Sequence, residues 1–234
     1  MSSNLEEIKL PLILVNFKTY SEATGIKGLE LARKAQEISL DTEVSIAVAP
    51  QYTDIKTIAD EVEIPVFSQH IDPVAQGAYT GHITAEAVKD AGAVGTLLNH
   101  SERRLKLSEI DEALRKAKSV GLTTVVCANT PSVSAATAAL NPEMVAIEPP
   151  ELIGTGVAVS KAKPEVIKQT VSQVMGVNSK IAILCGAGIT SGEDVSAALK
   201  LGMQGVLVAS GVVKAKNQKV ALLDLANPIR EAAK

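Results

Sequence analysis

The sequence has no tryptophan, and aromatic residues account for only 2% of its 234 positions. Large rings therefore cannot fill its interior, so the core must be built mainly from alanine, valine, isoleucine and leucine. Short aliphatic runs of this kind are typical of parallel strands that are buried on both faces. A chain of this length is compatible with one large barrel or with two small domains.

Cysteine is also scarce, with only Cys127 and Cys185 in the chain. Two cysteines are too few for a disulfide framework, and they lack the paired spacing of a zinc site. Both fall inside apolar runs, where we expect small buried thiols. Unpaired thiols of this kind predict a reducing, cytoplasmic location.

Positive charge is not in excess, because the formal net charge is −3. This balance argues against nucleic acid or an anionic membrane as a partner. The first seven residues are polar and acidic, unlike a signal peptide. The uncharged stretch 121–142 is interrupted by Asn129 and Pro131, so we expect no transmembrane helix there. An anionic ligand must then be held by local dipoles rather than by a basic surface.

Short apolar runs alternate with longer segments of helical spacing along the whole chain. This order predicts an α/β protein, a single (β/α)8 TIM barrel domain over residues 1–234. A doubly wound open sheet is the alternative, but it would need a Gly-x-Gly-x-x-Gly turn after the first strand. We expect strands at 10–15, 44–49, 65–67, 93–98, 123–128, 144–147, 181–184 and 205–208, with helices at 21–38, 54–62, 85–91, 108–120, 164–175 and 192–201.

Several residues indicate where the helices begin and end. Ser21 and Ser108 are candidate N-caps, and Pro164 fits the first turn of a helix. The fifth connection, residues 132–140, is rich in alanine and serine and is too short to predict a full helix. Residues 221–233 predict a final helix that Pro228 interrupts.

The strands predicted at 10–15, 93–98, 144–147, 181–184 and 205–208 end near residues that can do chemistry. In a parallel barrel the carboxyl ends of all strands meet on one rim, where active sites lie. Small residues before a helix start offer backbone amides and a helix dipole to an anion. These rim residues are Asn16, Lys18, His100, Glu148, Gly188, Ala209 and Ser210.

The stretch that follows the sixth predicted strand is the most informative of these. Glu148 is succeeded by two prolines, which hold it extended at the strand tip. Residues 153–156, Ile-Gly-Thr-Gly, then form a glycine-containing loop whose amides can approach a ligand closely. A carboxylate placed between a stiff hinge and such a loop suits a general base that works beneath a closing lid.

Each of these features has an ordinary structural explanation when taken alone. Asn16 and Lys18 can be a solvated strand end, His100 can cap a turn, and Glu148 can simply precede a turn. The other two histidines, His70 and His82, have no evident partner and are expected to be structural or on the surface. The functional prediction therefore rests on the set, which predicts one constellation on one rim.

That set resembles the triosephosphate isomerase family. The matching blocks follow the family order: 16–18 (Asn-Phe-Lys), 77–81 (Gly-Ala-Tyr-Thr-Gly), 99–104 (Asn-His-Ser-Glu-Arg-Arg), and 148–149 with 153–156. The resemblance covers essentially the whole chain. It implies the interconversion of dihydroxyacetone phosphate and glyceraldehyde 3-phosphate through an enediolate, with no metal and no organic cofactor.

The resemblance also implies a role for each matched residue. Glu148 would be the base, and His100 would act as a neutral imidazole that polarises the carbonyl, an arrangement for which this family is the usual illustration. Lys18 would place positive charge beside the oxyanion and the phosphate, and Asn16 would orient the substrate oxygens. The phosphate would be bound by Asn16, Lys18, Ile153, Gly154, Gly188, Ala209 and Ser210.

Some positions depart from the usual family pattern. Residues 186–188 read Gly-Ala-Gly where Gly-Gly-Ser is usual, which removes a serine hydroxyl, and 209–210 read Ala-Ser for Gly-Gly. The hinge 149–152 reads Pro-Pro-Glu-Leu where Val-Trp-Ala usually follows the first proline. Glu148 follows His100 by only 48 residues, a compact spacing that resembles the archaeal branch. That branch implies a homotetramer, with a dimer as the alternative, and residues 77–81 resemble a loop that reaches a neighbouring subunit.

Three other functions remain as alternatives. An aldolase or a pentose-phosphate epimerase would share the turns at Gly188 and Ser210. An aldolase, however, needs a Schiff-base lysine where the sixth strand offers Glu148, and a metal-dependent epimerase needs a cluster of histidine and aspartate. A non-catalytic barrel that senses phosphometabolites would need only the phosphate-binding part.

Overall fold

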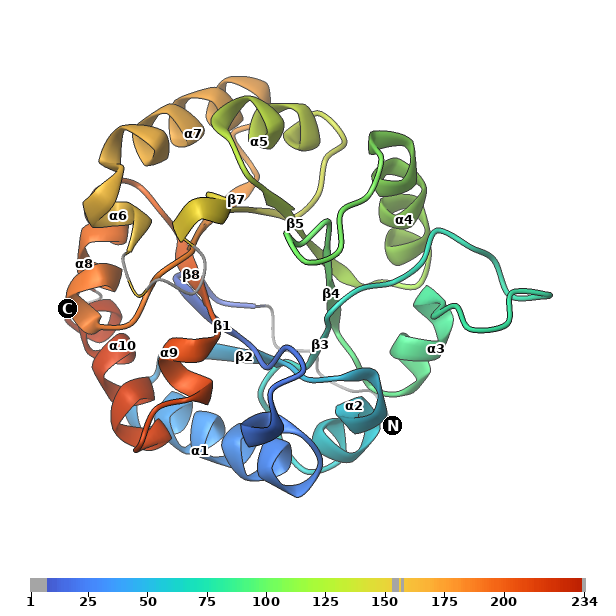
Figure 1. Cartoon of the computed structure of the whole chain (residues 1–234), viewed down its shortest axis with the longest axis horizontal. Coiled ribbons are helices and arrows are strands. Elements are labelled where there is room, and N and C mark those ends of the chain that lie inside the picture. The colour runs from blue at the N-terminus through green and yellow to red at the C-terminus, as the bar shows by residue number, and fades with distance from the viewer. Residues whose placement is uncertain (1–7, 153–155, 157, 233–234) are drawn as a thin grey trace.

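The computed structural model describes residues 8–152, 156 and 158–232. Its sheet contains eight parallel strands in the order β2-β1-β8-β7-β6-β5-β4-β3. A parallel bridge between Val48 and Val66 joins β2 to the β3 side, so that the sheet curls into a barrel (Figure 1). The predicted (β/α)8 fold is confirmed. The strands are β1 (Leu12–Asn16), β2 (Ser45–Ala49), β3 (Phe67–Ser68), β4 (Gly95–Leu98), β5 (Thr123–Ala128), β6 (Met144–Ile147), β7 (Ala182–Gly186) and β8 (Gly205–Val208).

The helices form a ring around the outside of the barrel. No helix among the described residues is both long and apolar enough to cross a membrane. The helices of this part of the chain are η1 (Ser21–Ala23), α1 (Ile26–Thr42), α2 (Tyr52–Ala59), α3 (Ala85–Asp90), α4 (Leu107–Ser119), α5 (Pro131–Ala138), η2 (Pro150–Leu152), α6 (Val159–Ala162), α7 (Pro164–Val177), α8 (Gly192–Lys200), α9 (Ser210–Val213) and α10 (Gln218–Ala232).

Successive residues of each strand point to opposite faces, which divides the aliphatic core in two. In β1, Ile13 and Val15 pack toward the helices, in a buried cluster that covers the outer face of the sheet. Leu12 and Leu14 belong to a second buried cluster, which also contains Phe67 and fills the barrel interior.

Both predicted N-caps are wrong. Ser21 lies in the short helix η1, and α1 begins only after Gly25, whose φ of 60° breaks the helix. The Asp54 carboxylate accepts the Gly25 N–H at 2.8 Å and so fixes this break from another element. Ser108 lies inside α4, which begins after Lys106, and the Glu109 side chain accepts the Lys106 N–H at 2.7 Å.

The fifth connection contains a short helix, although the sequence did not predict a full helix there. α5 is eight residues long, begins with Pro131, and is capped by the Thr130 hydroxyl, which accepts the Val133 N–H at 3.2 Å. The connection is short, as expected, yet it is helical because proline at the first turn and a threonine cap favour a helix start.

The prediction that Pro228 interrupts the last helix is also wrong, because α10 runs through it. A proline at this position cannot donate to the carbonyl of Asp224, one turn earlier. Gly192 lies against that carbonyl, and a Cβ on Gly192 would lie 2.4 Å from it. The Gly192 N–H also donates to the Asp224 carboxylate at 2.8 Å. The start of α8 thus packs closely against α10 at the turn where α10 lacks one of its own hydrogen bonds.

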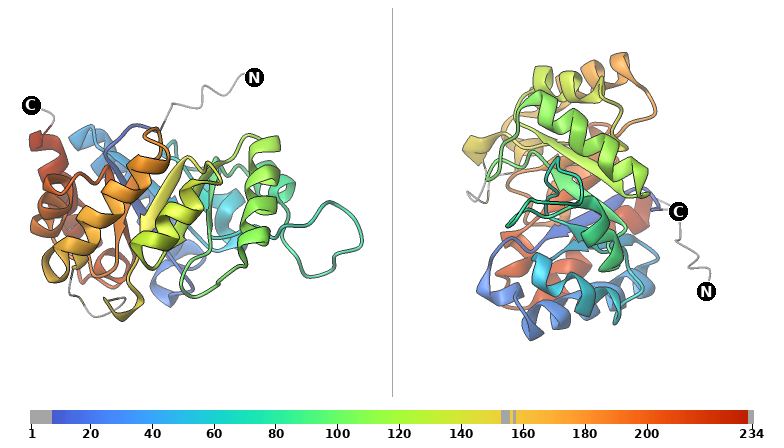
Figure 2. Two further views of the ribbon diagram at one scale, coloured as in Figure 1. Left: turned by 90° about the horizontal axis from the view of Figure 1, so that it is seen from above. Right: turned by 90° about the vertical axis from the view of Figure 1, so that its right-hand side faces the viewer.

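One segment leaves the barrel surface. The chain between β3 and α3 extends well away from the helices (Figures 1 and 2). This segment includes Tyr79, whose side chain is exposed although it is large and partly apolar. Asp72 and Ile83 close the base of the segment, since the Asp72 N–H donates to the Ile83 carbonyl at 2.8 Å.

Two glycines in different surroundings test this packing, because replacing each by alanine should change the free energy of unfolding in opposite directions. Gly95 in β4 lies against the Phe67 ring, and a Cβ there would lie 2.3 Å from a ring carbon. We predict that Gly95→Ala lowers the free energy of unfolding by about 1–3 kcal/mol, because the ring cannot move within the packed barrel. Gly176 in α7 has nothing within 4 Å of such a Cβ. Gly176→Ala should therefore raise stability by about 0.5–1 kcal/mol.

Urea unfolding of both variants provides the measurement, with the wild type as reference. Equal stability of Gly95→Ala and the wild type would contradict the described packing of Phe67 inside the barrel.

Candidate active site

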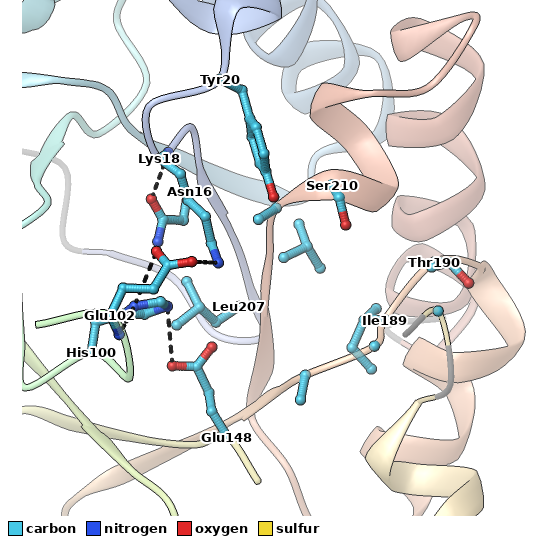
Figure 3. Close-up of a pocket in the computed structure, with 15 residues that line it drawn as sticks. Asn16, Lys18, Tyr20, His100, Glu102, Glu148, Ile189, Thr190, Leu207 and Ser210 are labelled. Atoms are coloured by element: carbon cyan, nitrogen blue, oxygen red, sulfur yellow. Dashed lines mark hydrogen bonds and ion pairs between the residues drawn. The ribbon is translucent and has the colours of Figure 1, made fainter. Parts of the chain in front are cut away.

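The carboxyl ends of the strands surround a cavity of about 250 Å³. Asn16 is the last residue of β1, Glu148 follows β6 directly, and His100 lies just after β4. Their side chains converge on the same space (Figure 3). The cavity lining contains Asn16, Lys18, Tyr20, His100, Glu102, Glu148, Gly156, Ala187, Gly188, Ile189, Thr190, Leu207, Val208, Ala209 and Ser210.

All the predicted rim residues within the described part of the chain line this cavity. Ile153 and Gly154, which were predicted to bind phosphate, lie outside the described residues.

Glu148 and His100 face each other at the floor of the cavity. The His100 Nε2 atom lies 3.5 Å from Glu148 Oε2. On the other side of the ring, Nδ1 accepts the backbone N–H of Glu102 at 3.2 Å. Because an acceptor nitrogen carries no proton, this bond assigns the proton of a neutral imidazole to Nε2. His100 therefore directs its N–H toward the cavity and the carboxylate.

The Glu148 side chain is almost completely buried, with 6% of the residue exposed. It fits because residue 186 is glycine: a Cβ there would lie 2.4 Å from Glu148 Cγ. Burial raises the pKa of Glu148, but the neighbouring His100 imidazole, helped by Cys127 and Lys18, outweighs this effect and lowers the pKa. The carboxylate is thus ionised at neutral pH, and Oε2 makes no hydrogen bond within the described residues.

Lys18 provides the positive charge of the cavity. Its Nζ atom forms an ion pair of 2.7 Å with Glu102, and only 11% of its side chain is exposed. The backbone at Lys18 is left-handed, with φ of 49°. This conformation is stabilised by Asn16, whose Oδ1 atom accepts the Lys18 N–H at 2.9 Å, and by Gln69, whose side chain donates to the Lys18 carbonyl at 2.9 Å.

Glu102 is the residue of this group that the sequence analysis missed. It holds Lys18 through its carboxylate and orients His100 through its backbone N–H. The signal was present, since Glu102 lies only two residues after His100 in the same block. Its partner Lys18, however, is 84 residues away in the chain, so only the folded barrel shows the pair.

The opposite side of the cavity is made of backbone and small side chains. Ala187 and Gly188 both have left-handed backbones, with φ of 69° and 74°. Ala209 and Ser210 stand at the start of α9. Amides at a helix start and in such a turn are suited to binding an anion.

Comparison with known proteins identifies the family. A family model for triosephosphate isomerase matches residues 11–228. The chain belongs to the triosephosphate isomerase family. Triosephosphate isomerases of three methanogens are similar over nearly their full lengths: 54% identity for Methanobacterium bryantii (96% of this chain, 100% of that one), 53% for Methanocaldococcus jannaschii (92% and 98%) and 55% for Methanosarcina acetivorans (92% and 97%).

A solved structure supports the fold. The triosephosphate isomerase of Bartonella henselae superimposes with a TM-score of 0.76 at 20% sequence identity, covering 94% of this chain and 99% of that one. The predicted resemblance to the family, including its archaeal branch, is therefore confirmed. The aldolase, epimerase and sensor alternatives are not favoured by these matches.

The two other histidines of this family member lie away from the cavity and share a partner. His70 Nε2 lies 3.1 Å from Asp72 Oδ1, and His82 Nδ1 lies 3.4 Å from Asp72 Oδ2. Arg103 also reaches Asp72 Oδ1, at 2.8 Å. The sequence offered no partner for either histidine because Asp72 becomes one only when the base of the protruding segment closes. Within the described residues, no group of three or more His, Cys, Asp or Glu is placed to hold a metal ion.

His70 gives a pH test of this cluster. Burial lowers its pKa below the ordinary value of 6.5, although its hydrogen bond to Asp72 acts the other way. A group with a depressed folded pKa favours the folded state above its unfolded pKa, and this stability is lost as the pH falls. The loss should begin near pH 6.5 and continue toward the lower folded pKa.

We therefore predict that the wild type loses more free energy of unfolding than His70→Asn between about pH 7.5 and 5. Urea unfolding at both pH values gives the change in the free energy of unfolding with pH. For each protein this change is calculated from its own free energy of unfolding at the higher pH. A change that is equal in the two proteins would show that His70 does not titrate with a depressed pKa.

Proposed function

We propose that this chain interconverts dihydroxyacetone phosphate and D-glyceraldehyde 3-phosphate. One observation carries the proposal: an ionised, buried carboxylate lies 3.5 Å from the N–H side of an imidazole, in a cavity that also holds a lysine. A base, an electrophile and a positive charge are the groups that proton transfer next to a carbonyl requires. The family match over residues 11–228 supports the same activity.

In the proposed mechanism Glu148 removes a proton from the substrate carbon beside the carbonyl. The C–H electron pair forms the carbon–carbon double bond of an enediolate, and the carbonyl oxygen takes up the negative charge. His100 donates its Nε2 hydrogen bond to that oxygen and then moves a proton between the two oxygens. Glu148 returns its proton to the neighbouring carbon, so no group is consumed.

Lys18 stabilises the developing negative charge, and Asn16 orients the substrate oxygens. Glu102 acts as a positioning residue, because it contacts Lys18 and His100 rather than the reacting atoms. Its ion pair limits where the Lys18 ammonium can lie. Preorganised charges of this kind need no rearrangement as the reaction proceeds.

We propose that the phosphate group lies on the backbone side of the cavity. Gly188, Ala209 and Ser210 would donate amide hydrogen bonds to it, at the strength of bonds to a charged acceptor. Ile153 and Gly154 would add amides from the lid. The reaction as proposed needs neither a metal ion nor an organic cofactor.

The remaining proposals concern the protein as a whole. We propose a single barrel domain that assembles as a homotetramer, with a dimer as the alternative. The exposed Tyr79 of the protruding segment offers a partly apolar side chain that a neighbouring subunit would cover. The buried, unpaired Cys127 and Cys185 are consistent with a reducing cytoplasm. Nucleic acid and membrane are not proposed as partners.

A coupled assay of glyceraldehyde 3-phosphate isomerisation tests the proposed activity. We predict that purified protein treated with a strong chelator keeps its full rate, since the mechanism uses only side chains and backbone amides. Loss of the rate on chelation, with recovery on adding a divalent metal, would favour a metal-dependent epimerase-type enzyme instead.

The assignment of the base is tested by Glu148→Asp. The shorter side chain withdraws the carboxylate from the substrate carbon, and a displacement of about 1 Å can cost about a hundredfold in rate. We predict a fall in kcat of at least about this size, with little change in KM. Glu165→Asp, in the exposed part of α7, is the matched control and should be fully active. Wild-type turnover by Glu148→Asp would remove Glu148 from the mechanism.

A further inference from the structure

The cavity wall contains one aromatic side chain that the proposed mechanism does not use. Tyr20 follows β1, after Asn16 and Lys18, and lines the cavity together with Ser210. Figure 3 shows its hydroxyl end directed toward the part of the cavity formed by Leu207 and Ser210. This is the backbone side, where the phosphate is proposed to bind.

Hydrogen bonds fix the backbone of Tyr20, and packing holds its ring. Its carbonyl accepts the Ala23 N–H at 3.0 Å and the Thr24 hydroxyl at 2.9 Å, and its N–H donates to the Phe17 carbonyl at 3.4 Å. Its ring packs against the outer core cluster. A side chain fixed in this way loses little conformational entropy when a ligand arrives.

A cation lies on the face of the Tyr20 ring. The Nζ atom of Lys214, at the end of α9, is 4.4 Å from the ring centroid. This distance is within the range of a cation–π interaction. Lys214 thereby brings a positive charge to the cavity wall without entering the cavity.

The charged side chains that line the cavity do not provide enough positive charge to bind a phosphate group. The charged side chains in the lining are Lys18, Glu102 and Glu148, which sum to −1, and Lys18 is already paired with Glu102 at 2.7 Å. A phosphate group that enters this cavity meets a net negative lining. It therefore needs additional donors and positive charge from the surrounding wall.

The Tyr20 hydroxyl is available for this purpose. Within the described residues, neither it nor the Ser210 hydroxyl has a hydrogen-bond partner. We propose that the Tyr20 hydroxyl is a ligand of the substrate phosphate, with Lys214 behind its ring supplying the compensating charge. This inference rests on the proposed function, and it makes Tyr20 a residue that selects phosphorylated over unphosphorylated trioses.

The first test is Tyr20→Phe, which removes only the hydroxyl. We expect KM for glyceraldehyde 3-phosphate to rise about tenfold, as for the loss of one hydrogen bond to a charged group, with kcat within about twofold of the wild type. The kcat/KM for unphosphorylated D-glyceraldehyde should not change. Tyr52→Phe, a tyrosine outside the cavity lining, is the matched control and should behave as the wild type.

A second pair of variants tests Lys214. Lys214→Met retains a flexible side chain but removes the charge, and we expect the dissociation constant for inorganic phosphate to rise about threefold. Lys216→Met, two residues further along and outside the cavity lining, is the control and should leave this constant unchanged. Titration calorimetry with inorganic phosphate measures it for both variants and for Tyr20→Phe, which should weaken binding by about tenfold.

Two results would overturn the proposal. One is an unchanged phosphate constant in both Tyr20→Phe and Lys214→Met. The other is an equal loss of kcat/KM for the phosphorylated and unphosphorylated triose in Tyr20→Phe. If the wild type fails to isomerise triose phosphate, the proposed function fails, whereas the phosphate titrations still decide the role of Tyr20.

Discussion

The site depends on one constraint, which is that a buried carboxylate must remain ionised. Glu148 is 6% exposed, and burial alone would favour its protonated form. His100 lowers its pKa from 3.5 Å away, and Cys127 and Lys18 contribute in the same direction. The absence of a Cβ at Gly186 provides the space that the side chain occupies. The lowered pKa makes the carboxylate a weaker base than a free one, but it keeps the group ionised at neutral pH and so ready to accept a proton.

The barrel brings these groups together from distant parts of the sequence. Each comes from the carboxyl end of a different strand, so the spacing of the strands sets the spacing of the chemistry. The Lys18–Glu102 ion pair then connects the β1 and β4 ends, and the Glu102 backbone fixes the tautomer of His100. The same ion pair partly offsets the charge of Lys18. The phosphate side of the cavity therefore depends more on backbone amides and on the wall formed by Tyr20.

The sequence predicted features that arise from local patterns. Aliphatic runs marked all eight strands, and the residues after them marked the rim, where Asn16, His100 and Glu148 line the cavity. It failed where a distant residue decides the local structure. Asp54 fixes the start of α1 in place of the Ser21 cap, and the Gly192 N–H of α8 binds the Asp224 carboxylate beside the turn of α10 that contains Pro228. The pairs of Glu102 with Lys18, Asp72 with Arg103 and Tyr20 with Lys214 form only in the folded chain, because their members lie far apart in the sequence.

The most direct test of the account follows hydrogen exchange at the substrate carbon. Dihydroxyacetone phosphate is incubated with the protein in deuterated water, and NMR measures deuterium incorporation for the wild type and for Glu148→Gln, which keeps the shape of the side chain but not its basicity. The account predicts rapid exchange with the wild type and a loss of at least about a thousandfold with Glu148→Gln, while inorganic phosphate still binds. Exchange at the wild-type rate in Glu148→Gln would contradict the central claim that this buried carboxylate is the base.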